Sequence, residues 1–233
     1  MNRRIVSGSL LAVLLAPLLV AASTAAAATS VTHDEFKTYL ETRDALEDER
    51  VKKMPEKQRI PAIASRNFKM KASALQEILD KVEAAGGEQA IADEAKKAVA
   101  EALAATPLAS RVTEVKVDTS APHVVTYIYW TVADETRTDA DAALIALKAG
   151  GVAPITSTFR LIGRNAAGAD IYRANIAADR TKRIREERID DWASTRYRGL
   201  FEVEAITAPI PPAAPTPVPA PAAPATSAPA AAQ

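Results

Sequence analysis

The spacing of apolar positions divides the chain into a first part with the period of a helix and a second part with the period of a strand. In the first part, apolar residues recur at three- and four-residue intervals and predict a helical stripe formed by Leu75, Ile78, Leu79 and Val82. From Val112 onward, β-branched and aromatic residues alternate with polar ones, as in half-buried strands. This change of period predicts the α+β class, with helices first and a mixed sheet afterwards.

The first expected helix begins with a capping box. Thr32 stands at its N-cap and Glu35 follows three residues later, so each side chain can satisfy a free backbone N–H of the first turn. The helix is expected to run to about Lys53. It should end before Pro55, because the residue that precedes a proline avoids the α conformation.

Two further helices are expected over residues 62–85 and 88–105, so that the helical region contains two to three helices. Pro55 and Pro61 frame a polar connection in front of the first of these. The glycine pair at residues 86–87 separates the two, because glycine readily adopts the left-handed conformation that ends a helix.

The second part of the chain is predicted to fold as a small mixed sheet with helices. The expected strands are 112–117, 123–132, 155–162, 170–176 and 200–206, and the expected helices are 140–149 and 180–192. From the second strand onward the order is βαββαβ, which is the order of ferredoxin-like sheets. The first strand is then one extra strand, and the third and fourth strands form a hairpin.

The first 28 residues have the composition of an export signal. Arg3 and Arg4 form a positive start, residues 5–20 are apolar, and residues 21–28 are small enough for cleavage. The apolar run is short and polar residues soon follow it, so we expect no stable membrane span after signal removal; a retained anchor is the alternative. The sequence therefore predicts a periplasmic or secreted protein of a bacterial envelope.

The end of the chain is rich in proline and alanine. Nine of the fifteen prolines lie in residues 208–233, and this segment contains no charged side chain. Such a composition has little to bury and favours an extended, disordered chain, acting as an inert tail, a spacer or a proline-rich ligand. The expected organisation is a signal peptide (1–28), a helical region (29–107), an α+β domain (108–206) and a disordered tail (207–233).

Charge and cysteine content argue against several classes of protein. The chain has 29 basic and 29 acidic residues, and removal of the signal with Arg3 and Arg4 leaves a net charge of −2. Nucleic acids select clustered positive charge, so no nucleic-acid partner is expected. Because the chain has no cysteine, an exported form has no disulfide and must be stabilised by a packed core.

The sequence contains no recognised catalytic or cofactor motif. Its glycines form no nucleotide-binding loop, its serines stand in no nucleophile motif, and its two histidines, His33 and His123, are far apart. The acidic stretch 134–141 has oxygen ligands for calcium, but it lacks the pattern of an EF-hand loop, and helix capping explains the same acids. We expect no metal, no cofactor and no enzymatic activity; a carboxylate site without a recognised motif is the alternative.

The strongest predicted strand carries a candidate binding face. Tyr127 and Tyr129 lie on one of its faces, because successive side chains of a strand alternate. The opposite face should belong to one apolar core that contains Ile128, Trp130, Leu144, Phe159 and Leu161. If it is exposed, the tyrosine face, together with Arg173, would offer a platform to a sugar, a peptide or a partner. The alternative is that helices cover both faces.

Residues 127–176 resemble the SPOR domains of bacterial envelope proteins, which bind peptidoglycan. The resemblance rests on a strand, the helix pattern of residues 141–151 and a hairpin that ends at residues 171–174. It covers under a third of the chain, and residues 132–134 (Val-Ala-Asp) replace the Gly-Ser-Phe-like turn of that family. The resemblance implies a βαββαβ fold, and it accompanies the alternative function of a glycan- or small-ligand-binding module.

The leading functional expectation is an exported, non-enzymatic structural or accessory protein. It would work through contacts with an envelope protein or a cell-wall component. The export signal, the proline-rich tail and the failure of each catalytic motif all favour this hypothesis over an enzyme.

Overall fold

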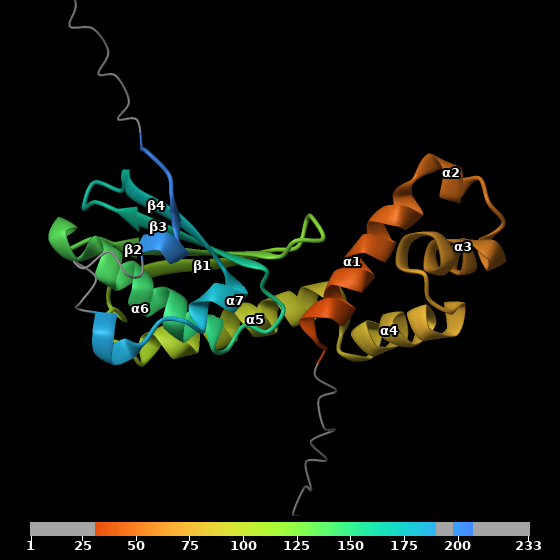
Figure 1. Cartoon of the computed structure of the whole chain (residues 1–233), viewed down its shortest axis with the longest axis horizontal. Helices are drawn as coiled ribbons and strands as arrows, with labels where there is room; N and C mark the ends of the chain where they lie inside the picture. Colours follow the sequence, from red (N-terminus) through yellow and green to blue (C-terminus); the bar gives the residue numbers. More distant parts are fainter. Residues whose placement is uncertain (1–30, 190–197, 207–233) are drawn as a thin grey trace, which may run out of the picture.

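The computed structural model describes residues 31–189 and 198–206 of the chain. Figure 1 shows an elongated molecule, with a helical region at one end and a sheet with its own helices at the other. In the described residues, helices precede a five-stranded mixed sheet along the chain. This order confirms the α+β class that the change of period predicted.

The elements of the two ends have the following bounds. The helical region contains α1 (His33–Glu47), α2 (Glu49–Lys52), α3 (Glu56–Ile63), a π-helix (Ala64–Phe68), α4 (Ala72–Ala84) and α5 (Gly87–Ala104). The sheet region contains β1 (Val112–Asp118), β2 (Val125–Thr131), α6 (Thr138–Gly150), β3 (Thr158–Arg164), β4 (Asp170–Ala177), α7 (Ala178–Thr181) and β5 (Glu202–Val203). Short 3-10 turns at Glu135–Arg137 and Arg198–Leu200 precede α6 and β5.

The predicted capping box at the start of α1 is confirmed. The Oγ1 atom of Thr32 accepts a hydrogen bond from the Glu35 N–H at 3.3 Å, and a Glu35 carboxylate oxygen accepts one from the Thr32 N–H at 2.8 Å. The predicted uninterrupted helix to about Lys53 is wrong, because α1 ends at Glu47 and a separate helix, α2, begins at Glu49. There the Asp48 side chain accepts a hydrogen bond from the Arg50 N–H at 2.7 Å, so it caps α2 and does not continue α1.

The segment between Pro55 and Pro61 is helical and not the polar connection that was predicted. α3 starts after Pro55 and includes Pro61. A proline inside a helix removes one backbone hydrogen bond, and burial of Ile63 in the local core offsets this loss. The chain continues as the π-helix and leaves the helical conformation at Lys69, whose φ is 52°. The single helix predicted over 62–85 is therefore interrupted before α4.

Helix α5 connects the two ends of the molecule. Gly86, with a φ of 96°, lies between α4 and α5, where the sequence predicted a helix end. Ile91, in the first half of α5, packs in a cluster with Phe36 and Val82 of the helical region. Leu103, in the second half, belongs to the large core of the sheet region. One helix thus contributes to the packing of both ends (Figure 1).

The strands follow one another across the sheet in the order β1-β2-β3-β4-β5. β2 and β3 pair directly and in parallel, with α6 as the crossover, and the other neighbouring pairs are antiparallel. The spatial strand order of a ferredoxin-like sheet is therefore not the observed one. In a ferredoxin-like sheet, a hairpin strand lies between the two parallel strands that the first helix connects. Side-chain alternation is the same in both orders, so it does not decide which strand edges meet. The extra first strand is present as β1, at the edge beside β2.

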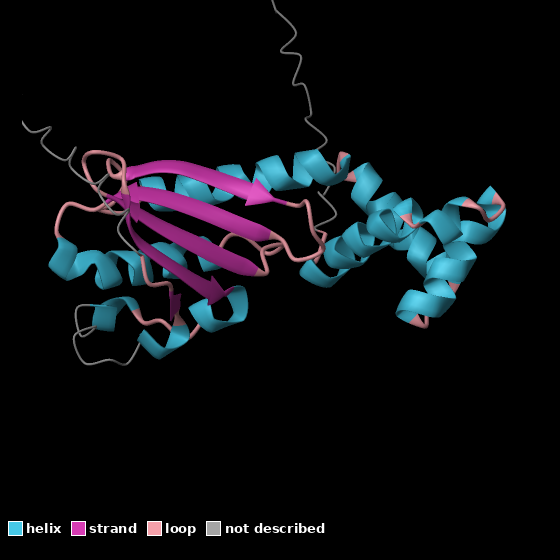
Figure 2. Ribbon diagram, turned by 90° about the horizontal axis from the view of Figure 1, so that it is seen from above, coloured by secondary structure: helices cyan, strands magenta, loops and turns pink. Residues whose placement is uncertain are grey.

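Helices of the described chain lie on one side of the sheet, and the opposite face carries none (Figure 2). The covered side holds the predicted core. Ile128, Trp130, Phe159 and Leu161 are fully buried, and the half-buried Leu144 of α6 packs against them. The alanines of α6 allow this close approach of helix to sheet, since Ala142, Ala143, Ala146 and Ala149 are all fully buried.

The last elements are shorter than predicted. In place of the helix expected over 180–192, the described part contains the end of α7, a turn and a short 3-10 stretch at residues 186–189. The Thr181 hydroxyl donates to the Ala178 carbonyl at 2.7 Å, and the Ile184 N–H donates to the Thr181 carbonyl at 3.1 Å, which tightens the chain into turns. Ile184 and Ile189 are nevertheless buried in the core. The strand expected over 200–206 is reduced to the two residues of β5.

The predicted signal peptide (1–28), the whole of the predicted tail (207–233) and the last residues of the helix predicted over 180–192 lie outside the described residues. In the two described stretches, none of the helices combines the length and the apolar character that crossing a bilayer requires.

Candidate ligand-binding face

The helix-free face of the sheet carries Tyr127 and Tyr129. Both side chains are half-buried, whereas Ile128 and Trp130 on the other face are fully buried. Cross-strand pairing arranges the residues of the helix-free face in two rows, which are Lys116–Tyr127–Arg160–Asn175 and Glu114–Tyr129–Ile162–Arg173. Each tyrosine therefore has a charged neighbour on the edge strand β1.

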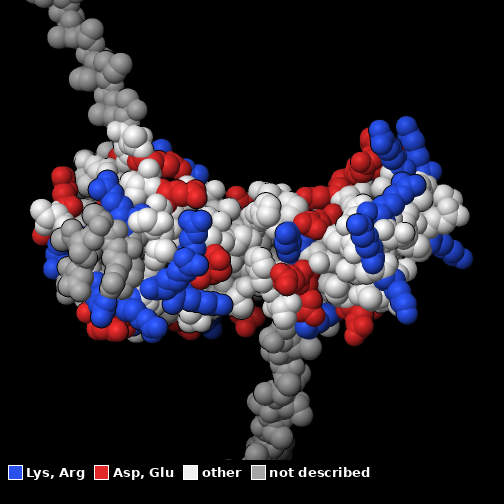
Figure 3. Space-filling view, in the orientation of Figure 1, with Lys and Arg blue, Asp and Glu red and all other residues white. Residues whose placement is uncertain are grey.

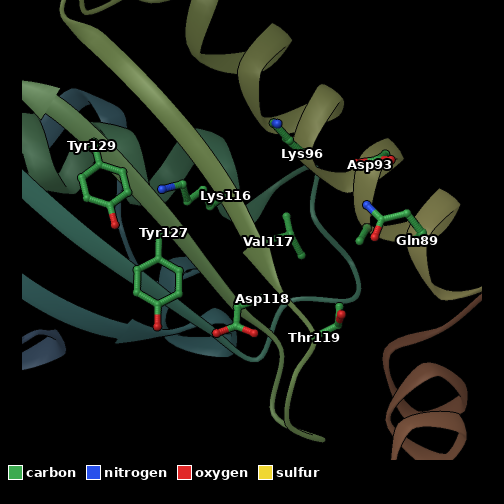
Figure 4. Close-up of a pocket in the computed structure, with 10 residues that line it drawn as sticks. Gln89, Asp93, Lys96, Lys116, Val117, Asp118, Thr119, Tyr127 and Tyr129 are labelled. Carbon is green, nitrogen blue, oxygen red and sulfur yellow. The ribbon is translucent and has the colours of Figure 1, made fainter.

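A hollow of about 460 Å³ lies beside the two tyrosines, where β1, β2 and α5 meet (Figure 4). Its remaining polar lining consists of Gln89, Asp93 and Lys96 from α5 and Lys116, Asp118 and Thr119 from β1 and the turn after it. Figure 4 shows the two rings projecting to the same side of β2, with the Lys116 side chain between them and α5. The hollow thus has aromatic rings along one wall and polar side chains along the others.

The ring of Tyr129 is held by cations from both neighbouring strands. The guanidinium carbon of Arg164 lies 4.3 Å from the ring centroid, and the Lys116 ammonium lies 5.6 Å from it. Lys116 also pairs with Glu114 at 3.0 Å. Cation–π contacts at partly exposed sites are worth about 0.5–1 kcal/mol each, so they orient this ring more than they stabilise the fold.

Tyr127 is placed differently. Within the described ranges its ring makes no aromatic or cation–π contact, so no cation covers it as Lys116 and Arg164 cover the ring of Tyr129. Asp118 lies near the Tyr127 hydroxyl in Figure 4. The hydroxyl and the N–H of Ser120, the latter at 2.9 Å, donate to Asp118 and hold the pKa of this carboxyl below its usual range. The hollow therefore has an ionised hydrogen-bond acceptor, Asp118, in the same lining as the Tyr127 ring.

The charges around the hollow are balanced. Lys96 and Lys116 contribute two positive charges, and Asp93 and Asp118 contribute two negative charges. A site for phosphate or nucleic acid would have an excess of positive charge. Balanced polar groups beside aromatic rings instead suit an uncharged, hydrogen-bonding ligand.

The third predicted site residue, Arg173, does not line the hollow. It lies in the same row as Tyr129, but two strands away, with Ile162 between them. Its guanidinium donates to Asp170 at 2.8 and 3.1 Å, and Arg164 donates to the same carboxylate at 3.0 Å. Burial raises the pKa of Asp170, but the hydrogen bonds from the two arginines outweigh burial and lower it. Arg173 is therefore connected to Tyr129 only through Asp170 and Arg164.

Ion pairs occupy the other half of the helix-free face. Arg160 donates to both carboxylate oxygens of Glu204, at 2.8 and 2.9 Å, and Asn175 donates to the same group at 3.0 Å. These contacts tie β3 and β4 to the chain beyond β5. The accessible part of the face is therefore the part formed by β1 and β2.

Several of the other candidate residues of the sequence make contacts within the fold. The His33 Nδ1 atom lies 3.1 Å from the Ile155 carbonyl oxygen, and His123 is exposed. Of the acids considered for calcium, Asp134 accepts hydrogen bonds from the N–H and hydroxyl of Thr136, and Asp141 pairs with Arg111 at 2.8 Å. No group of three histidine, aspartate or glutamate side chains in the described stretches is arranged to hold a metal ion.

A second hollow, of about 640 Å³, lies at the far end of the sheet. It is formed by the start of α6, by β4 and by the residues around β5, and its wall includes the nine-tenths-buried Tyr172. Burial, with the negative charge of Asp139, raises the pKa of the Tyr172 hydroxyl far above its ordinary value. Arg198 belongs to its lining, and residues 190–197 lie outside the described residues.

The sequence did not reveal the contribution of α5 to the tyrosine hollow. Gln89, Asp93 and Lys96 belong to the polar side of an amphipathic helix, which by itself indicates only solvent exposure. Their proximity to Tyr127 depends on how α5 packs against β1, about which helical periodicity carries no information.

Comparison of the chain with models of known protein families gives no match, and comparisons with curated proteins and with solved structures give no significant match.

Proposed function

We propose that this protein is a non-enzymatic, exported binding protein of the bacterial envelope that holds a glycan segment of the cell wall in the tyrosine hollow. One observation carries the proposal: two half-buried tyrosines of the helix-free face line a hollow where β1, β2 and α5 meet. A volume of about 460 Å³ is within the range of small-ligand sites.

The chemistry of a sugar matches this lining. The apolar face of a sugar ring packs on an aromatic ring, and its hydroxyls need hydrogen-bond donors and acceptors at the rim. The Tyr127 ring supplies the first, while Lys96, Asp118 and Gln89 supply the second. Because the lysines and aspartates balance, an uncharged glycan enters without leaving an unpaired charge behind.

The ends of the chain support an extracytoplasmic location for such a ligand. We propose that residues 1–28 direct export and are removed, and that residues 207–233 form an extended spacer. N-terminal sequencing of the protein from a periplasmic fraction tests the first point, with a mature start expected between Ala26 and Ser30. Recovery of intact Met1 from the membrane fraction would indicate a retained anchor instead.

The competing function is contact with another envelope protein along the edge strand β1. No strand of the described chain pairs with the outer edge of β1, and such edges recruit extended partner segments. However, β1 has a register shift between Val112 and Glu114 and an ion pair between Glu114 and Lys116. Bulges and charged side chains are the features that protect edges from pairing, so this observation favours the glycan.

The test is a titration with oligomers of N-acetylglucosamine, the uncharged sugar of wall glycan, followed by NMR and calorimetry. We expect chemical-shift changes confined to β1, β2 and the first half of α5. Loss of ring stacking in Tyr127→Ala should weaken binding about tenfold, and Tyr127→Phe should retain most of the affinity. The control Thr113→Ala, on an exposed part of β1 outside the hollow, should bind like the parent. Equal affinity of Tyr127→Ala and parent, or shifts elsewhere on the surface, would overturn the proposal.

A further inference from the structure

The end of the molecule farthest from the sheet carries a concentration of positive charge that the tyrosine hollow does not use. Residues 50–71 contain eight basic side chains and one acidic side chain, although the whole chain has a formal net charge of zero. We call residues 50–71, which comprise α2 without its first residue, α3, the π-helix and the residues that follow it, the basic tip. Figure 3 shows lysine and arginine gathered at this end. Its basic residues are Arg50, Lys52, Lys53, Lys57, Arg59, Arg66, Lys69 and Lys71.

Only two of these side chains stabilise the fold directly. Lys52 pairs with Glu47 at 2.8 Å, and the Arg59 guanidinium donates to the carbonyls of Met54 and Lys52 at 3.1 and 2.9 Å. The other six are exposed and make no ion pair with any carboxylate of residues 31–189 and 198–206. Most of the positive charge of the basic tip is therefore available to an external partner.

Lys69 occupies a backbone conformation that favours glycine. Its φ of 52° makes it the one non-glycine residue with positive φ in the described parts of the chain. Its N–H bonds to the Ala64 carbonyl, as at the end of many helices, but this cap uses the backbone and not the lysine side chain. A lysine here costs stability relative to glycine, and such strain often accompanies function.

Apolar side chains lie among the cations. Met54, Ile60, Phe68 and Met70 are half-buried, and the last three pack against the small core of Ile63, Ala64 and Leu75. Their exposed parts and the aliphatic stems of the lysines give the tip an amphipathic surface. Figure 1 shows α2 and α3 at the extremity of the elongated molecule, where they can meet a flat surface without hindrance from the sheet.

We propose that the basic tip docks the protein on the anionic phospholipid surface of a membrane. Clusters of four to eight lysines and arginines bind such surfaces, and each cation near the surface contributes about a fivefold gain in affinity. The half-buried methionines and Phe68 favour a bilayer over a nucleic acid, because they can enter the boundary between headgroups and acyl chains. Docking by this end leaves the sheet at the other end free, so the inference is independent of the glycan proposal.

The test measures binding of the full chain to vesicles of phosphatidylcholine with and without phosphatidylglycerol. The variant Lys53→Gln/Lys57→Gln/Lys69→Gly removes three free cations and should lose about 100-fold of the affinity for the anionic vesicles. The matched control Lys97→Gln/Lys182→Gln/Arg183→Gln removes three exposed cations elsewhere and should bind like the parent. All variants share residues 1–30, so any contribution of this apolar segment is the same in each.

A single variant separates docking from folding. Lys69→Gly relieves the positive φ and should raise the melting temperature, yet it should weaken binding to anionic vesicles about fivefold. Raising the salt from 0.05 to 0.5 M should weaken parent binding strongly, as expected for surface charges. Equal binding to vesicles with and without phosphatidylglycerol would overturn the proposal. So would equal losses in the tip and control variants, or binding to a DNA duplex in place of vesicles.

Discussion

The sheet end and the helical end of this molecule are packed to different degrees. The sheet end buries one large cluster that includes Trp130, Phe159 and Ile128, all fully excluded from solvent. The small core of the helical end has three buried members, Ile63, Ala64 and Leu75, surrounded by half-buried neighbours. Because cooperative stability grows with buried apolar surface, the sheet end should be the rigid scaffold and the helical end the more mobile part.

A junction with its own cluster holds the two ends together. Phe36, Val82 and Ile91 form part of this cluster. Beside it, Arg43 of α1 donates to Glu88 at 2.8 Å and to the Thr119 carbonyl at 3.0 Å. The same Glu88 accepts a hydrogen bond from the Thr119 hydroxyl at 2.6 Å, so one carboxylate joins α1, α5 and the turn after β1. The junction therefore places the hollow at a defined distance from the helical end.

The largest effect is expected from Trp130→Ala, which removes the largest fully buried side chain of the sheet core. Truncation of a buried tryptophan costs about 3–5 kcal/mol, a large part of the stability of a typical domain. The loss should abolish cooperative thermal unfolding, as followed by circular dichroism. Tyr129→Ala, on the helix-free face, should cost much less. If the two variants melted alike near the parent temperature, the assignment of the two faces of β2 would be wrong.

A somewhat smaller and more local effect is expected from Leu75→Ala. Leu75 is fully buried in the small helical core, and its truncation should cost about 2–4 kcal/mol. Because this core does not include the sheet, hydrogen exchange should accelerate in α3 and α4 while β2 and β3 stay protected. Ile78→Ala, at a half-buried position of the same helix, serves as the milder control. Equal acceleration in the sheet would show that the two ends unfold as one unit.

The hydrogen bonds of Arg43 at the junction should contribute less to the free energy of unfolding than either core. Arg43→Ala removes the hydrogen bonds to Glu88 and Thr119, and since Arg43 is about a third exposed, we expect a loss of about 1–2 kcal/mol. The two ends should then unfold in separable steps, visible as non-coincident denaturation curves of tryptophan fluorescence and far-ultraviolet circular dichroism. Lys37→Ala, which breaks only a 3.8 Å surface pair on the same helix, should leave the curves coincident.

The smallest expected effect concerns pH and the start of α1. Hydrogen bonds from Lys81, and then from Thr32, lower the pKa of Glu35 to about 2 from an ordinary value of 4.5. A lowered folded-state pKa stabilises the fold above about pH 4.5, and this contribution is lost as the pH falls toward 2. Glu35→Gln should therefore cost about 1 kcal/mol at pH 6, after allowance for solvent screening, and almost nothing near pH 2. Urea denaturation at both pH values checks this, with Glu41→Gln as the exposed control; a cost that does not change with pH would contradict it.

The sequence by itself determined the features that depend on neighbouring residues along the chain. The capping box of Thr32 and Glu35 formed as predicted, because its bonds join atoms of one helical turn. The alternation of Ile128 and Trp130 with the two tyrosines likewise follows from the pleat of a single strand. The convergence of these core positions with Phe159 and Leu161 was also predictable, since each was the apolar member of its own alternation.

Only the tertiary structure decided which elements meet. The direct pairing of β2 with β3 depends on which strand edges come together, and either order satisfies the same alternation. The π-helix before Lys69 lies where Phe68 and Met70 pack against the small core, a contact that helical periodicity alone does not predict. The hollow arises from the same non-local step, because the polar side of α5 reaches Tyr127 only when its apolar side packs beneath β1. Contacts between distant segments lower the free energy of the whole fold. The periodicity of apolar residues within one segment does not indicate which distant segment it will contact.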